Sequence, residues 1–300
     1  MQPVASETAQ LQRPPRARKL HPLLQIDAWR DAQLGSWLDA SHRLLEPLSS
    51  GGFGHVFLAE HVQQGTLSAA KLALPGKVIA AAVLRQEAEL LARVAHPYIV
   101  AYRDYGRTPS GAAYLRMEYA PGVDLETWLE EHGPMPAQRA LDVLRQLAAA
   151  LDYLHAQHIV HADLKPAHVV LDERAADRIK LVDFGCAFDD RDDRQARDVA
   201  GTPGYMAPEQ VRGERCGPAI DVYGLAALAT ELLTGQLPHT NTTRSVVRAV
   251  LRDPPALPSD RGLIRPGLDA CFAKALHKRP RERFESASAF VTALEQCFAH

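Results

Sequence analysis

The chain has 300 residues, of which 46% are hydrophobic and 23% are charged, and its formal net charge is −2. This length suits one two-lobed domain or two domains of ordinary size, and the composition allows a large buried core. The near-neutral charge argues against a nucleic-acid partner and provides no general attraction to anionic membranes.

The cysteines and the apolar stretches indicate the compartment. Cys186, Cys216, Cys271 and Cys297 have no metal-type spacing, so neither a zinc site nor a disulfide framework is predicted. The longest apolar stretch, residues 222–229, is too short to cross a bilayer, and the start of the chain lacks an apolar signal core. We expect a cytoplasmic protein with no membrane insertion.

The first forty residues do not have the pattern of a packed domain. Residues 1–22 are rich in proline and basic side chains and poor in large apolar ones, which predicts a disordered tail. A docking role for the basic cluster is the alternative. Residues 23–40 carry an apolar pattern with Trp29 and Trp37, and we expect a helical or extended N-terminal extension there.

Short β-type runs dominate the next part of the chain, at residues 44–48, 56–62, 67–74 and 114–119. One helical pattern interrupts them at residues 79–94. Its apolar stripe is expected to comprise four residues with Glu87 lying among them: Val83, Leu90, Leu91 and Val94.

The position of Glu87 predicts an ion pair. An unpaired buried carboxylate would destabilise the fold strongly, so a cation is expected nearby. Lys71 lies between apolar residues of a predicted strand and is the candidate. The alternative is that Glu87 lies at an exposed edge of its helix.

Helices are predicted after Gly122. One helix has an inward face of five leucines, Leu141, Leu144, Leu147, Leu151 and Leu154, and residues 221–233 are apolar nearly all round, as in a fully buried helix. The prediction is therefore α+β: a small lobe at about 41–117, a hinge at 118–122, and a larger helical lobe at 123–298. A cleft between two such lobes suits a nucleotide.

Several short motifs follow one another along these elements. Residues 48–56 read LSSGGFGHV, a turn whose glycines would let backbone amides approach phosphate oxygens. By itself this signal is weak, because glycine-rich hairpins are common. Lys71 comes next, followed by HADLKP at 161–166, DFG at 183–185 and APE at 207–209.

With these motifs in this order, residues 41–298 resemble the eukaryotic-type protein kinase family. The segment GTPGYMAPE at 201–209 is most similar to the Ser/Thr kinases of bacteria. The resemblance implies a small antiparallel β-sheet lobe with one key helix and a larger, mainly helical lobe. It also implies transfer of the γ-phosphoryl group of ATP to Ser or Thr hydroxyls of protein substrates.

The resemblance gives each matched residue a role. Asp163 would be the catalytic base, Lys165 would neutralise the γ-phosphate, and Asp183 would hold Mg²⁺. The ATP site would combine the phosphate loop, the ion pair, the hinge and the apolar contacts to adenine: Ser49, Gly51, Gly52, Gly54, Val56, Ala69, Lys71, Glu87, Met117, Glu118, Ala120 and Val170.

Four further residues would support the site without reacting. Asp221 would bond the amides of the catalytic loop, and Thr202 would contact that loop. Phe184 would pack beneath the helix of Glu87. Glu209 would pair with Arg283.

The largest departure from the family is His168, which stands where the family has a metal-binding Asn. Mg²⁺ prefers oxygen ligands, whereas imidazole suits softer metals. The second metal position is therefore expected to be weakened, lost or shifted towards Mn²⁺; the alternative is a histidine that does not touch the metal. Ser49 replaces the first glycine of the phosphate loop, and we expect this change to be tolerated.

A second departure concerns regulation. Ala162 replaces an arginine that in many family members binds a phosphate on the activation segment, and residues 186–200 contain no Ser, Thr or Tyr. We therefore expect activity that does not depend on phosphorylation of this loop.

Two other functions remain open at this point. His168 is compatible with a pseudokinase that binds ATP and acts as a scaffold, and the lobes and aspartates are compatible with a small-molecule phosphotransferase. The APE-like segment argues against the latter, because such enzymes normally lack it. A regulatory partner protein fits any of these functions.

Overall fold

The computed structural model of the protein describes residues 33–51, 54–74, 78–193, 201–239 and 246–299. The predicted tail at 1–22 and residues 23–32 of the extension lie outside the described residues. The last part of the extension is a turn, after which Trp37 forms an isolated bridge with Arg43. Leu38 is fully buried against the first sheet, so this end of the extension belongs to the compact unit.

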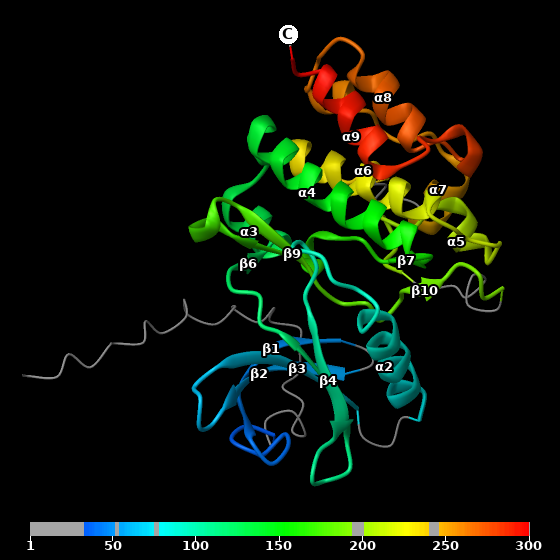
Figure 1. The fold of residues 1–300 in the computed structure, drawn as a ribbon. Helices are drawn as coiled ribbons and strands as arrows, with labels where there is room; N and C mark the ends of the chain where they lie inside the picture. The colour runs from blue at the N-terminus through cyan, green and yellow to red at the C-terminus, as the bar shows by residue number, and fades with distance from the viewer. Residues whose placement is uncertain (1–32, 52–53, 75–77, 194–200, 240–245, 300) are drawn as a thin grey trace, which may run out of the picture.

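The smaller lobe is built on a five-stranded antiparallel sheet with the order β1-β2-β3-β5-β4 (Figure 1). The strands are β1 (His42–Ser50), β2 (Gly54–His61), β3 (Leu67–Ala73), β4 (Tyr102–Arg107) and β5 (Ala113–Glu118). Helix α2 (Val78–Leu91) packs against β3, β4 and β5. The four predicted runs all became strands, and β3, between β2 and β5, has six of its seven residues buried.

Strand β4 was not predicted. Its sequence YRDYGR includes Asp and Gly, and none of its residues is buried, so it lacks the usual strand pattern. Its pairing with β5 creates the strand. Gly106 is required for that pairing, because a Cβ there would lie 2.8 Å from the hydroxyl oxygen of Tyr114.

Helix α2 confirms the prediction that Glu87 points inwards, with 2% of its surface exposed. The stripe around it differs slightly from the expected one. Leu84 and Ala88 are buried, whereas Val83 is only half-buried. The helix is rotated so that Glu87 lies near the middle of the buried face.

The larger lobe is mainly helical (Figure 1). Its helices are α3 (Leu125–His132), α4 (Ala137–Ala156), α5 (Pro208–Arg212), α6 (Ala219–Thr234), α7 (Val246–Arg252), α8 (Leu268–Ala275) and α9 (Ala287–Gln296). Its short strands form two small sheets, β6-β8-β9 and β7-β10: β6 (Val123–Asp124), β7 (Ile159–Val160), β8 (Val169–Asp172), β9 (Arg178–Leu181) and β10 (Phe188–Asp189).

The core of this lobe lies where α4, α6 and α9 meet. All five leucines of the predicted face of α4 are buried, and α6 is buried along almost its whole length, as expected. Among the helices in the described ranges, none combines the length and the apolar character needed to cross a bilayer. The four cysteines are free thiols.

A buried ion pair ties α5 to the turn before α9. Arg283 donates to both carboxylate oxygens of Glu209, at 2.5 and 2.7 Å, and to the carbonyl oxygens of Ala219 and His277. The side chain of Arg283 is 0% exposed. This pair was expected, and every donor it uses has an acceptor, which limits the desolvation cost.

Arg283→Met should lower the free energy of unfolding by about 3–5 kcal/mol, because Glu209 would keep a buried charge without its partner. Urea denaturation measures the loss. The matched control is Arg281→Met, whose side chain is 78% exposed, and it should stay within about 0.5 kcal/mol of wild type. Similar losses in both variants would contradict this account.

Candidate active site

Three charged side chains from different elements meet between the lobes. Strand β3 supplies Lys71, α2 supplies Glu87, and Asp183 follows β9. The Lys71 ammonium donates to both oxygens of Glu87, at 3.0 and 2.7 Å, and to Oδ1 of Asp183, at 3.0 Å. The ion pair predicted from the stripe is therefore present, and Asp183 joins it.

The charges of this triad support one another. Burial disfavours the charge on Lys71, but Asp183 and Glu87 outweigh it and hold the pKa of Lys71 above its usual range. Burial acts on Asp183 in the same way, and the ammonium of Lys71 overcomes it, so the pKa of Asp183 lies below its usual range. Both groups are charged at pH 7. A carboxylate kept ionised in a partly buried position is a ready ligand for a hard cation.

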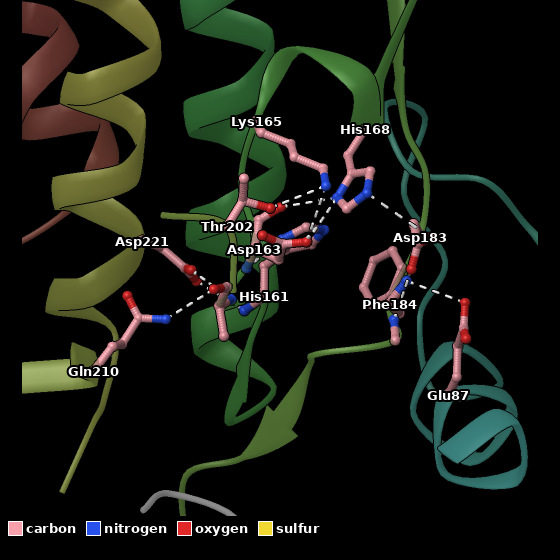
Figure 2. A network of polar contacts seen from close by, with 12 residues as sticks. Glu87, His161, Asp163, Lys165, His168, Asp183, Phe184, Thr202, Gln210 and Asp221 are labelled. Atoms are coloured by element: carbon pink, nitrogen blue, oxygen red, sulfur yellow. Dashed lines mark hydrogen bonds and ion pairs between the residues drawn. The ribbon is translucent and has the colours of Figure 1, made fainter. Parts of the chain in front are cut away.

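The DFG segment is fixed to α2 by its backbone. The N–H of Phe184 donates to Oε1 of Glu87 at 3.2 Å, and the side chain of Phe184 is 1% exposed with its ring edge-on to His161 (Figure 2). Asp183 has a positive φ of 66°, and the N–H of Gly185 donates back to its Oδ1 at 3.0 Å. These bonds offset the strain of a left-handed, non-glycine residue.

The catalytic loop between β7 and β8 rests on the start of α6. Asp221 is 1% exposed and accepts from the N–H groups of His161 and Ala162, both at 2.9 Å, as expected from the resemblance. His155 of α4 adds a third contact to the same carboxylate, at 2.8 Å. Burial opposes this charge, and the contact with His155 leads the interactions that lower the pKa of Asp221 below its usual value.

Ala162 is held in an unusual backbone conformation, with φ at 65°. Its N–H is bound by Asp221, and its carbonyl oxygen accepts from the side-chain amide of Gln210 at 2.8 Å (Figure 2). Gln210 and His155 are the supporting residues that the motifs did not reveal. Gln210 directly follows the APE motif, and that position is the only sequence signal for it.

Asp163 and Lys165 lie close to His168, which faces Asp183 on its other side (Figure 2). Lys165 donates to the Thr202 hydroxyl at 3.0 Å and lies 3.6 Å from Oδ2 of Asp163. Thr202 thus contacts the catalytic loop, as predicted. Oδ1 of Asp163 is buried and has no hydrogen-bond partner within the described ranges. Asp163, Thr202 and Tyr205 are among the residues that line a small hollow there.

His168 lies between the two aspartates. Its Nδ1 is 2.9 Å from the backbone carbonyl oxygen of Asp163, and since a carbonyl only accepts, Nδ1 carries the hydrogen. Burial lowers the pKa of His168 against the opposing charges of Asp183 and Asp163, so the ring is neutral at pH 7. Nε2 then has a free lone pair, and it lies 3.8 Å from Oδ2 of Asp183. Nε2 of His168 and Oδ2 of Asp183 therefore face the same position.

The phosphate loop is described only in part. Gly52 lies outside the described residues, while Ser49 pairs with Val56 across the β1–β2 hairpin. Gly54 lies against β3, where a Cβ would come within 2.3 Å of the carbonyl oxygen of Leu72. A Cβ on Gly51 would meet nothing closer than 3.8 Å. One predicted phosphate-loop glycine therefore has a purely steric reason to be glycine.

The residues predicted to contact adenine divide into two groups. Ala69 and Met117 are register partners on β3 and β5, and they share one apolar cluster with Val56 and Ala120. Val170 is half-buried on β8 and is not part of that cluster as far as the described residues go.

The hinge residue Glu118 has its side chain committed elsewhere. It accepts from the N–H of Ala101 at 3.0 Å and from Lys180 at 2.8 Å. Its backbone N–H also donates to the carbonyl oxygen of Ala101, at 2.8 Å.

Comparison with protein families matches the protein kinase domain to residues 42–291. The chain belongs to the protein kinase family. Serine/threonine-protein kinase PknD of Mycobacterium tuberculosis is 36% identical over 263 residues, which cover 85% of this chain and 39% of that protein. PknF of the same species is 35% identical over 268 residues, covering 85% and 56%. PknH of Mycobacterium bovis is 32% identical over 281 residues, covering 90% and 46%.

These comparisons confirm the resemblance to bacterial Ser/Thr kinases and the two-lobed kinase fold. The chain spans roughly half the length of the relatives it matches, or less. The shared part is the kinase domain, which contains every site residue described above.

Gly54→Ala should lower the free energy of unfolding of the ligand-free kinase domain by about 1–3 kcal/mol, because β2 and β3 would be forced apart. Gly51→Ala is the matched control in the same loop and should change it by less than about 0.5 kcal/mol. Urea unfolding without nucleotide measures both. Equal losses would show that backbone proximity is not what Gly54 provides.

Proposed function

We propose that the protein is a Ser/Thr protein kinase, which transfers the γ-phosphoryl group of ATP to hydroxyl groups of protein substrates. The supporting observation is the convergence of Lys71, Asp163 and Asp183 around one position. Lys71 lies 3.0 Å from Asp183, and His168 contacts both the backbone of Asp163 and the carboxylate of Asp183. Phosphoryl transfer depends on such positioning and charge neutralisation.

Asp163 acts as the catalytic base. Its Oδ1 is a buried acceptor without a partner in the described part of the chain. A Ser or Thr hydroxyl that reaches Oδ1 would satisfy the orphan acceptor and have its proton accepted as the bond to phosphorus forms. Lys165, fixed by Thr202, places its ammonium where charge on the γ-phosphate needs neutralising.

Lys71 holds the α- and β-phosphates, and Glu87 keeps its ammonium in place. The phosphate loop with Ser49, Gly51, Gly52 and Gly54 covers the phosphates. The adenine ring lies among Val56, Ala69, Met117, Ala120 and Val170, and pairs with the backbone of Glu118 and Ala120. The contacts between Ala69 and Met117 support the upper part of this site.

The residues at the metal position fit a divalent cation. Oδ2 of Asp183 and Nε2 of His168 face each other at 3.8 Å, and two donors with this separation can share one ion. The ion would neutralise and orient the phosphates. Because one ligand is an imidazole nitrogen, we propose that the site is less selective for Mg²⁺ than an all-oxygen site and also binds Mn²⁺ well.

Activity does not depend on phosphorylation of the activation loop. Ala162 cannot bind a phosphate, and residues 186–200 offer no hydroxyl to modify. A regulatory partner protein remains part of the proposal. A cytoplasmic location does as well, supported by the four free thiols.

Asp163→Ala should reduce transfer of labelled γ-phosphate to a generic protein substrate by at least about 10²-fold, since the base is lost. Nucleotide affinity, measured by thermal shift, should stay near wild type because the proposed role of Asp163 is to bind the acceptor hydroxyl and not the nucleotide. Undiminished transfer would overturn the role of Asp163. Transfer to aminoglycosides but not to protein would favour the small-molecule phosphotransferase.

His168 favours a second candidate, an ATP-binding pseudokinase that acts as a scaffold. A site with one nitrogen ligand could bind nucleotide and yet hold the ion too weakly for transfer. This candidate predicts nucleotide binding with no transfer in Mg²⁺ or Mn²⁺. The intact triad of Lys71, Glu87 and Asp183 favours the active kinase.

His168→Asn should change the metal preference by about tenfold towards Mg²⁺, because a carbonyl oxygen replaces the imidazole nitrogen. Metal affinity of the ADP complex, measured by titration with each ion, reports this separately from turnover. Electron spin echo spectroscopy of the Mn²⁺–ADP complex should show a coupled histidine nitrogen in wild type only. Absence of that coupling in wild type would place His168 outside the metal shell.

A further inference from the structure

Helix α2 and the beginning of the activation segment, residues 183–193, are joined along a seam (Figure 1). The side-chain amide of Gln86 donates to the carbonyl oxygen of Ala187 at 3.1 Å. Arg93, in the turn two residues beyond the end of α2, donates to Oδ2 of Asp189 at 2.9 Å. The seam thus continues the bond between Glu87 and Phe184.

Arg93 makes two hydrogen bonds at this seam. Its second guanidinium nitrogen donates to the carbonyl oxygen of Gln157 at 2.7 Å, so one side chain ties the end of α2 to two segments of the larger lobe. The side chain of Arg93 is 37% exposed and that of Asp189 is 18% exposed. A planar fork with two acceptors holds its partners better than a single exposed ion pair does.

Asp189 is itself held on the opposite side. It lies in β10 and is the register partner of Ile159 in β7, directly before the catalytic loop. The next residue, Asp190, is anchored as well: its N–H donates to the carbonyl oxygen of His158, and its own carbonyl oxygen accepts from Arg215. Arg93 is therefore bonded to β10, and β10 is in turn bonded to the segment directly before the catalytic loop.

In many switches, a phosphate on a loop creates new pairs with arginine and orders that loop. The same charge pairing is already built from an unmodified carboxylate in this chain. We propose that Arg93 and Asp189 form a permanent clasp that holds α2 in the position where Glu87 reaches Lys71. They are positioning residues for phosphoryl transfer, and this inference rests on the proposed kinase function.

The consequence for the site is geometric. Glu87 can bond Lys71 at 2.7 Å only while α2 lies close to the DFG segment. Without the clasp, α2 would be held to the activation segment by the hydrogen bonds of Gln86 and Glu87, which are neighbouring residues of the helix. The population with Lys71 correctly placed would then fall, and with it the rate of transfer.

A charge exchange tests the clasp. Arg93→Asp and Asp189→Arg each place like charges together and should lower kcat/KM for ATP about three- to tenfold, as expected for one charge-assisted contact. The double variant restores opposite charges and should recover most of the loss. In the single variants, hydrogen exchange should become faster in residues 84–93 and 184–189, and it should slow again in the double variant.

Arg191→Ala is the matched control. Arg191 donates to the same carboxylate of Asp189, at 2.8 and 2.5 Å, but it belongs to the activation segment and does not touch α2. Its removal should leave kcat/KM and the exchange of α2 unchanged. A loss equal to that of Arg93→Asp would mean that only the local charge of Asp189 matters, and the clasp would be rejected.

Purely additive losses in the double variant, or single variants with wild-type activity and exchange, would also overturn the proposal. If a charge-reversed chain fails to fold, Arg93→Gln and Asp189→Asn give the same comparison as a double-mutant cycle, with a coupling expected between them. Phosphatase treatment of wild type, checked by intact mass, should leave activity unchanged. A drop in activity after this treatment would show that the ordered state needs a phosphate, and it would contradict a permanent clasp.

Failure of the kinase function can be told apart from failure of the clasp. If wild type transfers no phosphate, hydrogen exchange and ATP affinity in the same four proteins still report the position of α2. Exchange that rises in both single variants and recovers in the double variant supports a clasp in a nucleotide-binding protein. Exchange that is unchanged in all of them rejects the clasp whether or not the wild type is active.

Discussion

The structure depends on one buried ammonium group held between two carboxylates. Lys71, Glu87 and Asp183 come from a strand, a helix and a loop after another strand, and the buried ammonium stabilises the charge of both carboxylates. Their mutual attraction fixes the relative position of the sheet, α2 and the larger lobe. A site for a triphosphate and its cation follows, because the same charges complement phosphate and metal.

In the larger lobe, the catalytic loop is held rigidly in place. Asp221 at the start of the buried helix α6 binds two amides of the catalytic loop, and Gln210 binds the carbonyl oxygen of Ala162. These contacts hold Ala162 in a left-handed conformation that a free loop would avoid. The loop therefore presents Asp163 and Lys165 from a fixed backbone, as a reaction driven by positioning requires.

Two departures from the family pattern concern different parts of the site, namely the metal position and the contacts of the activation segment. At His168, an imidazole nitrogen takes the place of the family's oxygen donor. The carbonyl group of Asp163 sets the tautomer of the ring. Ala162 removes a receptor for phosphate, and Asp189 supplies a fixed carboxylate near the same segment. The first departure bears on the proposed cation preference, and the second on the proposal that the ordered arrangement needs no phosphate. Both leave the triad intact.

The sequence by itself determined the α+β lobes, the five-leucine face of α4 and the ion pair of Lys71 with Glu87, because local periodicity and the cost of burying charge operate within short segments. The tertiary structure decided the rest. Strand β4 exists through pairing with β5, Leu84 replaces Val83 on the buried face of α2, and His155 joins Asp221 from another helix. Arg93 meets Asp189 across 96 residues. Contacts between distant segments leave no periodic signal in either one, so only the packed chain reveals them.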